Sequence, residues 1–104
     1  MRLDEIALAC RVRRVELRRW IEAGWLLPVI VDGDWQFEEV DVARARLIRD
    51  LRRDFGVNEA AVPLILDLID QRQGVERRLR RVLEALAGQP DELRREVISR
   101  LLGD

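Results

Sequence analysis

Histidine, lysine, tyrosine and threonine are absent from this 104-residue chain, and serine and cysteine occur once each, as Ser99 and Cys10. The usual general acids and bases are therefore missing, and only carboxylates remain for proton transfer. A serine or cysteine nucleophile would have no ordinary base beside it. A carboxylate pair of the glycosidase type stays possible, but the acids are spread along amphipathic segments. We therefore expect no catalytic residue and no enzyme.

The single cysteine permits no internal disulfide and, in a chain without histidine, no zinc site. Cys10 falls among apolar residues, so we expect it to be a small buried hydrophobe. One unpaired cysteine suits a reducing compartment. The N-terminus lacks signal-peptide character, and no apolar run approaches membrane-spanning length. The sequence thus predicts a cytoplasmic protein with no metal, cofactor or membrane contact.

Hydrophobic residues make up 48% of the chain and charged residues 38%, with few aromatics. Such a composition is typical of a soluble, helix-rich protein whose faces are sharply divided. The length predicts one compact domain overall. Within it we expect a first part over residues 1–58 and a C-terminal helical region over residues 59–104.

The first part reads as two helices followed by a hairpin. Apolar spacing predicts a helix over residues 4–10, a turn at residues 11–13 and a second helix that ends at Gly24. Two β-rich runs then flank Asp32-Gly33, which predicts a short hairpin. Trp35 and Phe37 should share a face and pack this wing onto the helices. The order is that of a winged helix-turn-helix.

A third helix is expected from about Glu38 to Phe55, and its apolar residues recur at helical spacing. These are Val40, Ala43, Leu47, Leu51 and Phe55, with Ile48 beside them. Gly56 is a natural C-cap, and Asn58 can cap the segment that follows.

The segment over residues 59–73 has two apolar faces, one of them carrying Leu64 and Leu68. A helix of this kind usually packs on two surfaces at once, so we expect its own core on one side and a dimer mate or a partner on the other. Regular helix should begin or kink near Pro63. Gly74 is expected to break the pattern before a short stripe at residues 75–86, and residues 88–90 before a last helix.

The charge balance of the helix-turn-helix does not favour DNA binding. Residues 1–37 hold six arginines against six acids, whereas DNA affinity depends mostly on neutralising phosphates. Two interpretations stay open for the second helix. Its arginines could contact DNA, or they could solvate its outer face and pair with Glu16 and Glu22. The four arginines in question are Arg13, Arg14, Arg18 and Arg19.

Two acid pairs stand out later in the chain. Asp50 and Asp54 are four residues apart near the end of the third helix, and Asp67 and Asp70 are three apart on the next. Acids near a helix C-terminus oppose the helix dipole, so Asp54 has a cost that a basic partner or neighbouring arginines would explain.

The order of these motifs resembles a known family. Residues 17–28, LRRWIEAGWLLP, resemble the second helix and exit turn of MerR-type winged-helix proteins. Together with Trp35-Gln36-Phe37 and the runs over residues 41–44, 51–58 and 65–70, they make residues 3–87 similar to the chaperone modulatory protein CbpM family. The resemblance implies an all-α, MerR-like winged helix-turn-helix with a small β-hairpin wing and a C-terminal helical arm.

The resemblance also implies a function and a partner. Members of that family bind the J-domain of a DnaJ-like, CbpA-type co-chaperone and block its action with DnaK. An acidic face would complement the basic helix of a J-domain. The candidate partner-binding residues are Asp50, Asp54, Leu64, Asp67, Leu68 and Asp70. A homodimer through the C-terminal helices is also expected.

Departures from the MerR pattern weaken the alternative, a DNA-binding transcriptional regulator. The turn holds Arg11-Val12 where that family usually has a glycine first, so we expect a different or strained turn. Arg13 occupies the usual serine cap position. Gln36 and Phe37 replace the wing residues that would face the DNA backbone. DNA binding should therefore be weak or absent.

Overall fold

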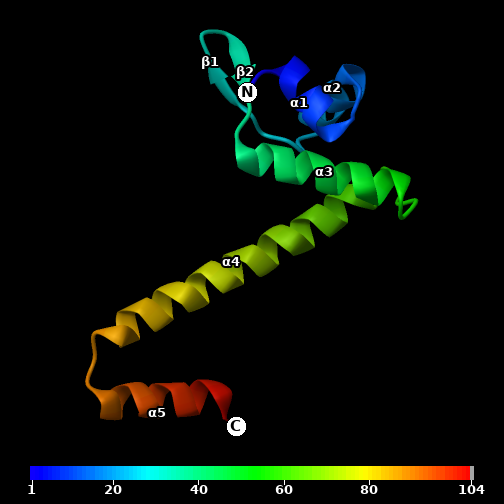
Figure 1. The fold of residues 1–104 in the computed structure, drawn as a ribbon. Helices are drawn as coiled ribbons and strands as arrows, with labels where there is room; N and C mark the ends of the chain where they lie inside the picture. Colours follow the sequence, from blue (N-terminus) through cyan, green and yellow to red (C-terminus); the bar gives the residue numbers. More distant parts are fainter. Residues whose placement is uncertain (104) are drawn as a thin grey trace. The chain divides into compact units, whose positions relative to one another are not determined.

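The computed structural model describes residues 1–103, and within them it has five helices and one hairpin (Figure 1). In chain order the elements are α1 (Leu3–Cys10), α2 (Arg14–Glu22), β1 (Val29–Val31), β2 (Asp34–Gln36), α3 (Glu39–Arg53), α4 (Val62–Ala87) and α5 (Asp91–Leu102). The predicted fold, an all-α winged helix-turn-helix with a small hairpin and a C-terminal helical arm, is confirmed.

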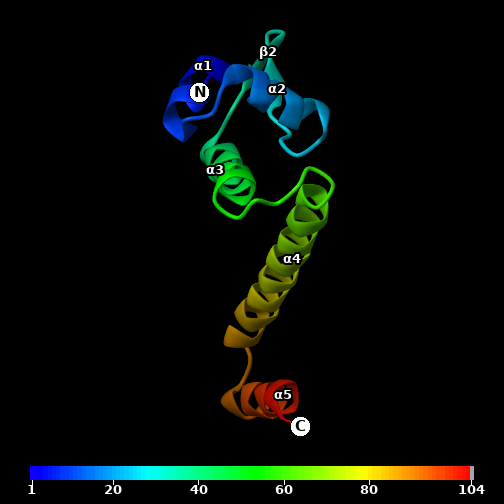
Figure 2. The ribbon, with the colours of Figure 1, turned by 90° about the vertical axis from the view of Figure 1, so that its right-hand side faces the viewer.

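The chain divides into two compact units, Met1–Leu66 and the residues from Asp67 onward. The first turns of α4 belong to the first unit's core, where Val62 is 0% and Leu66 2% exposed. In the first unit, α1 and α2 lie together on one side of α3 (Figures 1 and 2).

The turn between α1 and α2 has the strain that its sequence predicts. Arg11 adopts φ 54° and ψ 47°, the left-handed region that favours glycine. The conformation closes the end of α1, since the N–H groups of Arg11 and Val12 donate to carbonyls of the last turn. Gly24 takes the same role after α2 with φ 78°, which confirms it as the end of that helix.

The wing is a tight two-residue hairpin. Asp32 and Gly33 both have positive φ, 51° and 82°, as a type I′ turn requires. Beyond it, Phe37 is only 2% exposed and its N–H donates to the Met1 carbonyl over 2.7 Å. Trp35 is half-buried and packs against the core. The expected packing of the wing by these two aromatic residues is confirmed.

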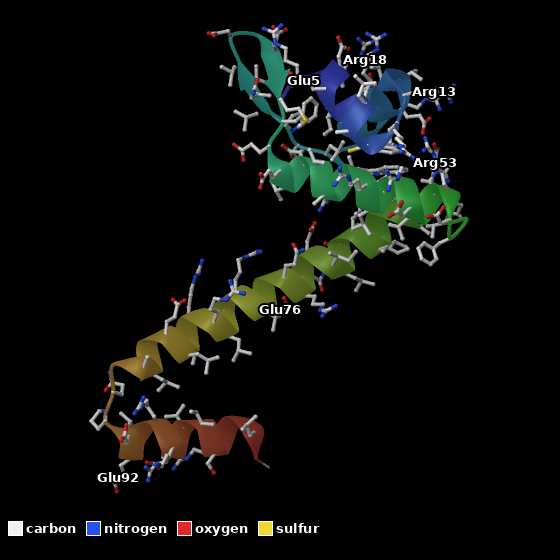
Figure 3. The ribbon with its side chains drawn as sticks, in the orientation of Figure 1. Glu5, Arg13, Arg18, Arg53, Glu76 and Glu92 are labelled. Carbon is white, nitrogen blue, oxygen red and sulfur yellow. The ribbon has the colours of Figure 1, made fainter. Side chains whose placement is uncertain are left out.

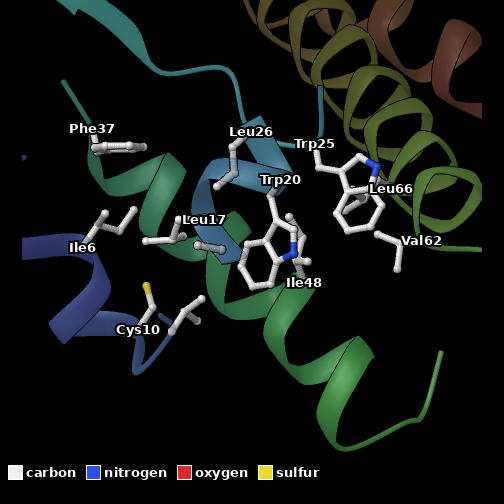
Figure 4. Close-up of a cluster of buried hydrophobic side chains, with 12 residues drawn as sticks. Ile6, Cys10, Leu17, Trp20, Trp25, Leu26, Phe37, Ile48, Val62 and Leu66 are labelled. Carbon is white, nitrogen blue, oxygen red and sulfur yellow. The ribbon is translucent and has the colours of Figure 1, made fainter. Parts of the chain in front are cut away.

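The core gathers apolar residues from α1, α2, α3, the wing and the start of α4 (Figure 4). Trp25 lies beside Val62 and Leu66 and joins α4 to the helix-turn-helix (Figure 4). Cys10 is fully buried in this cluster, as expected. The buried residues are Ile6, Cys10, Val12, Leu17, Trp20, Trp25, Leu26, Phe37, Ala45, Ile48, Val62 and Leu66.

Only part of the expected apolar stripe of α3 is buried, since Ile48 lies in the core and Leu47 packs against it. Val40 is 67% and Phe55 74% exposed, whereas Ala45 and Ile48 are fully buried. The small Ala45 suits the close approach of α1, whose Cys10 Sγ lies 3.6 Å from the Val42 carbonyl oxygen. Val40, in the first turn of α3, and Phe55, two residues beyond its end, are therefore exposed to solvent.

The start of α4 follows its sequence signals. Gly56, with φ 64°, is the left-handed residue that follows the end of α3. The Oδ1 atom of Asn58 accepts a hydrogen bond from the Ala61 N–H over 2.9 Å, so Asn58 caps the next segment as expected. Regular helix begins at Val62, next to Pro63, where the missing N–H of proline is harmless.

The expected break at Gly74 is wrong, because α4 runs without interruption from Val62 to Ala87. One glycine costs a helix interior only about 1 kcal/mol relative to alanine. Side-chain pairs on the same helix stabilise it around Gly74, and one of them is the 3.0 Å ion pair between Arg72 and Glu76. The apolar positions on either side of Gly74 therefore lie on one helix.

Candidate functional site

Two of the four candidate DNA-contacting arginines form ion pairs with acids; Figure 3 labels one of them, Arg13. The Nε atom of Arg13 lies 3.1 Å from Oε1 of Glu16, and Nη1 of Arg14 lies 3.0 Å from Oδ1 of Asp4. Both pairs are largely exposed, so each contributes little stability. Their effect is to offset the positive charge of the helix-turn-helix.

Arg18 and Arg19 differ from that pair. Both are exposed on α2, and neither makes a hydrogen bond or ion pair with any residue that the structure describes. The wing beside them offers no further cation, since no basic residue occurs between Leu26 and Ala43. Two arginines are few for a DNA surface, because a specific binder makes about six to ten phosphate contacts.

Three arginines of α3 bind the C-terminal end of α1, a feature that the sequence analysis missed. They follow one another at spacings of three and four residues, which places them on one helix face. Arg46 donates to the Ala9 carbonyl over 3.4 Å, Arg49 to the Cys10 carbonyl over 2.7 Å and Arg53 to the Arg11 carbonyl over 2.7 Å. That spacing was the only signal for them in the sequence.

These contacts satisfy carbonyl groups at the C-terminal end of α1 that would otherwise lack hydrogen-bond donors. The last carbonyls of a helix lack intrahelical partners and carry partial negative charge, and the last turn of α1 contains no basic residue. The α3 guanidinium groups supply both the donors and the charge. Arg53 also lies 3.8 Å from Glu16. These arginines therefore act within the protein.

Two of these arginines, Arg46 and Arg49, also act on the thiol of Cys10. Burial raises the pKa of its thiol, while the positive charges of Arg46 and Arg49 act in the opposite direction. The net shift is upward from the ordinary value of 9.0. A buried thiol of this kind is a poor nucleophile near neutral pH, which agrees with its place in the core.

Asp50 and Asp54 lie among arginines. Asp50 pairs with Arg49 over 2.9 Å, and the side chain of Asp50 is 40% exposed. Asp54 is the exposed C-cap residue of α3, and its carboxylate makes no hydrogen bond or ion pair with any described residue. Both line a shallow depression that Arg11, Arg46, Arg49 and Arg53 also line. The surface is thus mixed in charge, and Asp54 is its unpaired acid.

The six predicted partner-binding residues fall in both compact units. Asp50, Asp54 and Leu64 belong to the first unit, and Asp67, Leu68 and Asp70 belong to the second. Leu64 is 68% and Leu68 64% exposed, as surface contacts must be. Asp67 accepts a 3.0 Å hydrogen bond from Nε2 of Gln71.

Helix α4 carries an exposed apolar stripe in the second unit. Leu68, Val75, Leu79 and Val82 are each at least 44% exposed, and their spacings of seven, four and three place them within one narrow arc of the helix. Figure 3 shows apolar side chains along the exposed length of this helix. The stripe is thus an apolar surface left exposed in the second unit.

Other kinds of site are not seen in the part of the chain that the structure describes. No group of three or more cysteine or acidic side chains there could hold a metal ion. No helix of residues 1–103 is long and apolar enough to cross a membrane.

Comparisons with known proteins identify the fold family. The model of the MerR HTH family of regulatory proteins matches residues 1–84. Chaperone modulatory proteins CbpM of Coxiella burnetii strains Dugway 5J108-111 and RSA 331 / Henzerling II are each 29% identical over 84 residues, which cover 77% of this chain and 76% of each relative. No solved structure matches significantly. The resemblance to CbpM is thus confirmed, and the chain belongs to the MerR helix-turn-helix family of regulatory proteins.

Proposed function

We propose that this protein is a chaperone modulator that binds the J-domain of a DnaJ-like, CbpA-type co-chaperone and hinders its action with DnaK. The proposal rests first on the similarity to proteins named chaperone modulatory protein CbpM, which extends over 77% of the chain. The mechanism would be steric, with the modulator covering the J-domain surface that DnaK needs. Neither similar group of proteins is named as an enzyme.

The observation that carries the proposal is how the arginines of the helix-turn-helix are used. Arg13 and Arg14 pair with acids, and three α3 arginines bind carbonyls of α1 and its turn. A DNA reader needs its cations free to replace counterions on phosphates. Among the described residues, Arg13, Arg14 and the three α3 arginines already have partners inside the chain, whereas Arg18 and Arg19 have none. This use of the arginines supports another function for the scaffold of a DNA reader.

Asp54 is the best placed of the proposed contact residues. Its carboxylate is exposed and unpaired among the described residues, at the end of a helix where it opposes the dipole. A cationic group on a partner would remove that cost. Asp50 contributes beside Asp54, although the Asp50 carboxylate is already paired with Arg49. Leu64, Leu68, Asp67 and Asp70 complete the proposed set.

Calorimetric titration of the purified chain with an isolated J-domain tests the proposal. We expect a saturable complex whose affinity falls in the variants Asp50→Arg and Asp54→Arg. Glu92→Arg, on α5, makes the same change of charge away from the proposed residues and serves as the control. No complex at tens of micromolar would reject the proposal. Normal binding by both aspartate variants would move the site elsewhere.

We also propose that two copies pair along α4. The stripe of Leu68, Val75, Leu79 and Val82 is too exposed for a lone helix in water, and a second copy offers the same stripe in return. Light scattering should give the mass of a dimer for the native chain and of a monomer for Leu79→Glu. Arg77→Glu is a control on the same helix. A native monomer at high concentration would reject the pairing.

A second candidate function is DNA binding by a MerR-type regulator. Exposed Arg18 and Arg19, without partners among the described residues, are the observation in its favour. In that case a DNA complex should form at low salt, weaken as salt rises and disappear in Arg18→Ala and Arg19→Ala. Absence of a gel shift at low salt would count against this function.

A further inference from the structure

The wing presents an apolar strand with no neighbour on one side. Val29, Ile30 and Val31 of β1 are 53%, 68% and 48% exposed, and the preceding Leu27 is 79% exposed. The sheet has only two strands among the described residues, so one edge of β1 has no pairing strand. Figure 1 shows β1 on the side of the hairpin away from α1 and α2.

The register identifies which backbone groups face this free edge. Val31 pairs with Asp34 next to the two-residue turn, and Ile30 pairs with Trp35. Residues that flank such a turn form a hydrogen-bonded pair, and the next pair along does not. The N–H and C=O groups of Ile30 therefore point outward from the sheet. One donor and one acceptor are available there to an added strand.

The acidic residues near β1 indicate which kind of segment could bind at its free edge. Five acids and no basic residue occur between Leu26 and Ala43. Asp32 lies directly after β1, and Asp34 is across from Val31. Arg2, Arg18 and Trp35 line a shallow depression together with Asp34 of β2, which leaves Asp32 as the acid next to the outer edge of β1. The outer edge is thus both apolar and acidic.

We propose that the outer edge of β1 binds an extended segment of another protein in which apolar and basic residues alternate. The segment would add as a third strand, hydrogen-bonded to Ile30 and close to Asp32. DNA is disfavoured because its phosphates would meet carboxylates. A second copy is disfavoured because pairing two wings would join two segments that have acids and no cation. This surface is distinct from the proposed J-domain contacts.

The test uses the full chain and two synthetic peptides, one with valine alternating with arginine and the other with valine alternating with glutamate. Backbone amide shifts in NMR should move at residues 29–31 with the arginine peptide and not with the glutamate peptide. Ile30→Pro removes the outward N–H without breaking the ladder to β2, and should abolish binding. Ile30→Thr keeps the N–H and is the matched control.

The role of charge is tested with Asp32→Asn, because asparagine also suits the first position of a type I′ turn. We expect affinity to fall roughly two- to fivefold at low ionic strength, as for other exposed ion pairs. Equal binding of both peptides, shifts that map away from β1, or concentration-dependent shifts at β1 without peptide would each overturn the proposal. Asp54→Arg should leave peptide binding unchanged, so the failure of one proposal is distinguishable from failure of the other.

Discussion

Arg53 donates a 2.7 Å hydrogen bond from Nη1 to the carbonyl oxygen of Arg11, the residue that makes the left-handed turn of the helix-turn-helix. The contact joins the end of α3 to the turn that a DNA reader would use to orient its second helix. It stabilises an unusual backbone conformation with a charged donor. The same arginine is thereby withdrawn from any role toward a phosphate.

Replacing Arg11 with glycine should stabilise the protein. A non-glycine residue in the left-handed region costs about 1–2 kcal/mol, and the flexibility of glycine when unfolded offsets part of the gain. We expect a net increase of about 0.5–1 kcal/mol in the free energy of unfolding, measured by urea denaturation. Gly24→Ala, at φ 78°, is the matched opposite and should be destabilising. A lower stability for Arg11→Gly would show that its side chain matters more than the strain.

Removing Arg49 should be costly. It donates to the Cys10 carbonyl over 2.7 Å and pairs with Asp50, and its side chain is 23% exposed. Arg49→Met keeps much of the length but leaves the carbonyl unsatisfied, so we expect a loss of about 1.5–3 kcal/mol. Arg72→Met, at an exposed ion pair on α4, should cost less than about 0.5 kcal/mol. Similar losses in both variants would contradict the capping role.

The buried Cys10 predicts a loss of stability at alkaline pH. Burial raises the pKa of its thiol in the folded state above the ordinary 9.0. The unfolded chain therefore loses the thiol proton first, and the free energy of unfolding should fall as pH rises above about 9. Cys10→Ala should have lower stability at neutral pH but a flatter profile in denaturant titrations from pH 8 to 10. A slope that is unchanged in the variant would exclude the thiol as the cause.

Asp54 should lower the stability of the free protein and strengthen its complex with the J-domain. Its unpaired carboxylate opposes the dipole at the end of α3, so Asp54→Asn should stabilise the free protein by about 0.3–1 kcal/mol at low ionic strength. The same change should weaken the J-domain complex. Thermal denaturation and calorimetric titration of one variant measure both effects. If binding is unaffected while stability rises, the acid has no part in partner contact.

Local signals explain why much of the first unit is predictable from the sequence. The Asp32-Gly33 turn, the glycine stop after α2 and the cap at Asn58 each depend on residues close in the chain. The aromatic alternation of Trp35 and Phe37 correctly places the wing on the core. In each case the preference of one or two residues agrees with the packing around them.

The predictions that fail depend on distant contacts or on small energy differences. The buried face of α3 is set by the fit of Ala45 against α1, and apolar spacing alone favours Val40 and Phe55 instead. Gly74 disfavours helix by only about 1 kcal/mol, which the rest of a 26-residue helix overrides. The arginine contacts to α1 join residues 37 to 42 positions apart.

We propose that a DNA-reading scaffold serves here to occlude a co-chaperone from DnaK. The most direct test of this proposal is a competition in which a fluorescently labelled J-domain is bound to DnaK and the full-length chain is added. We expect the J-domain to leave DnaK as the chain is added, and Asp54→Arg to need a higher concentration for the same effect. A J-domain that binds this chain and DnaK at the same time, with unchanged affinity for each, would contradict the claim.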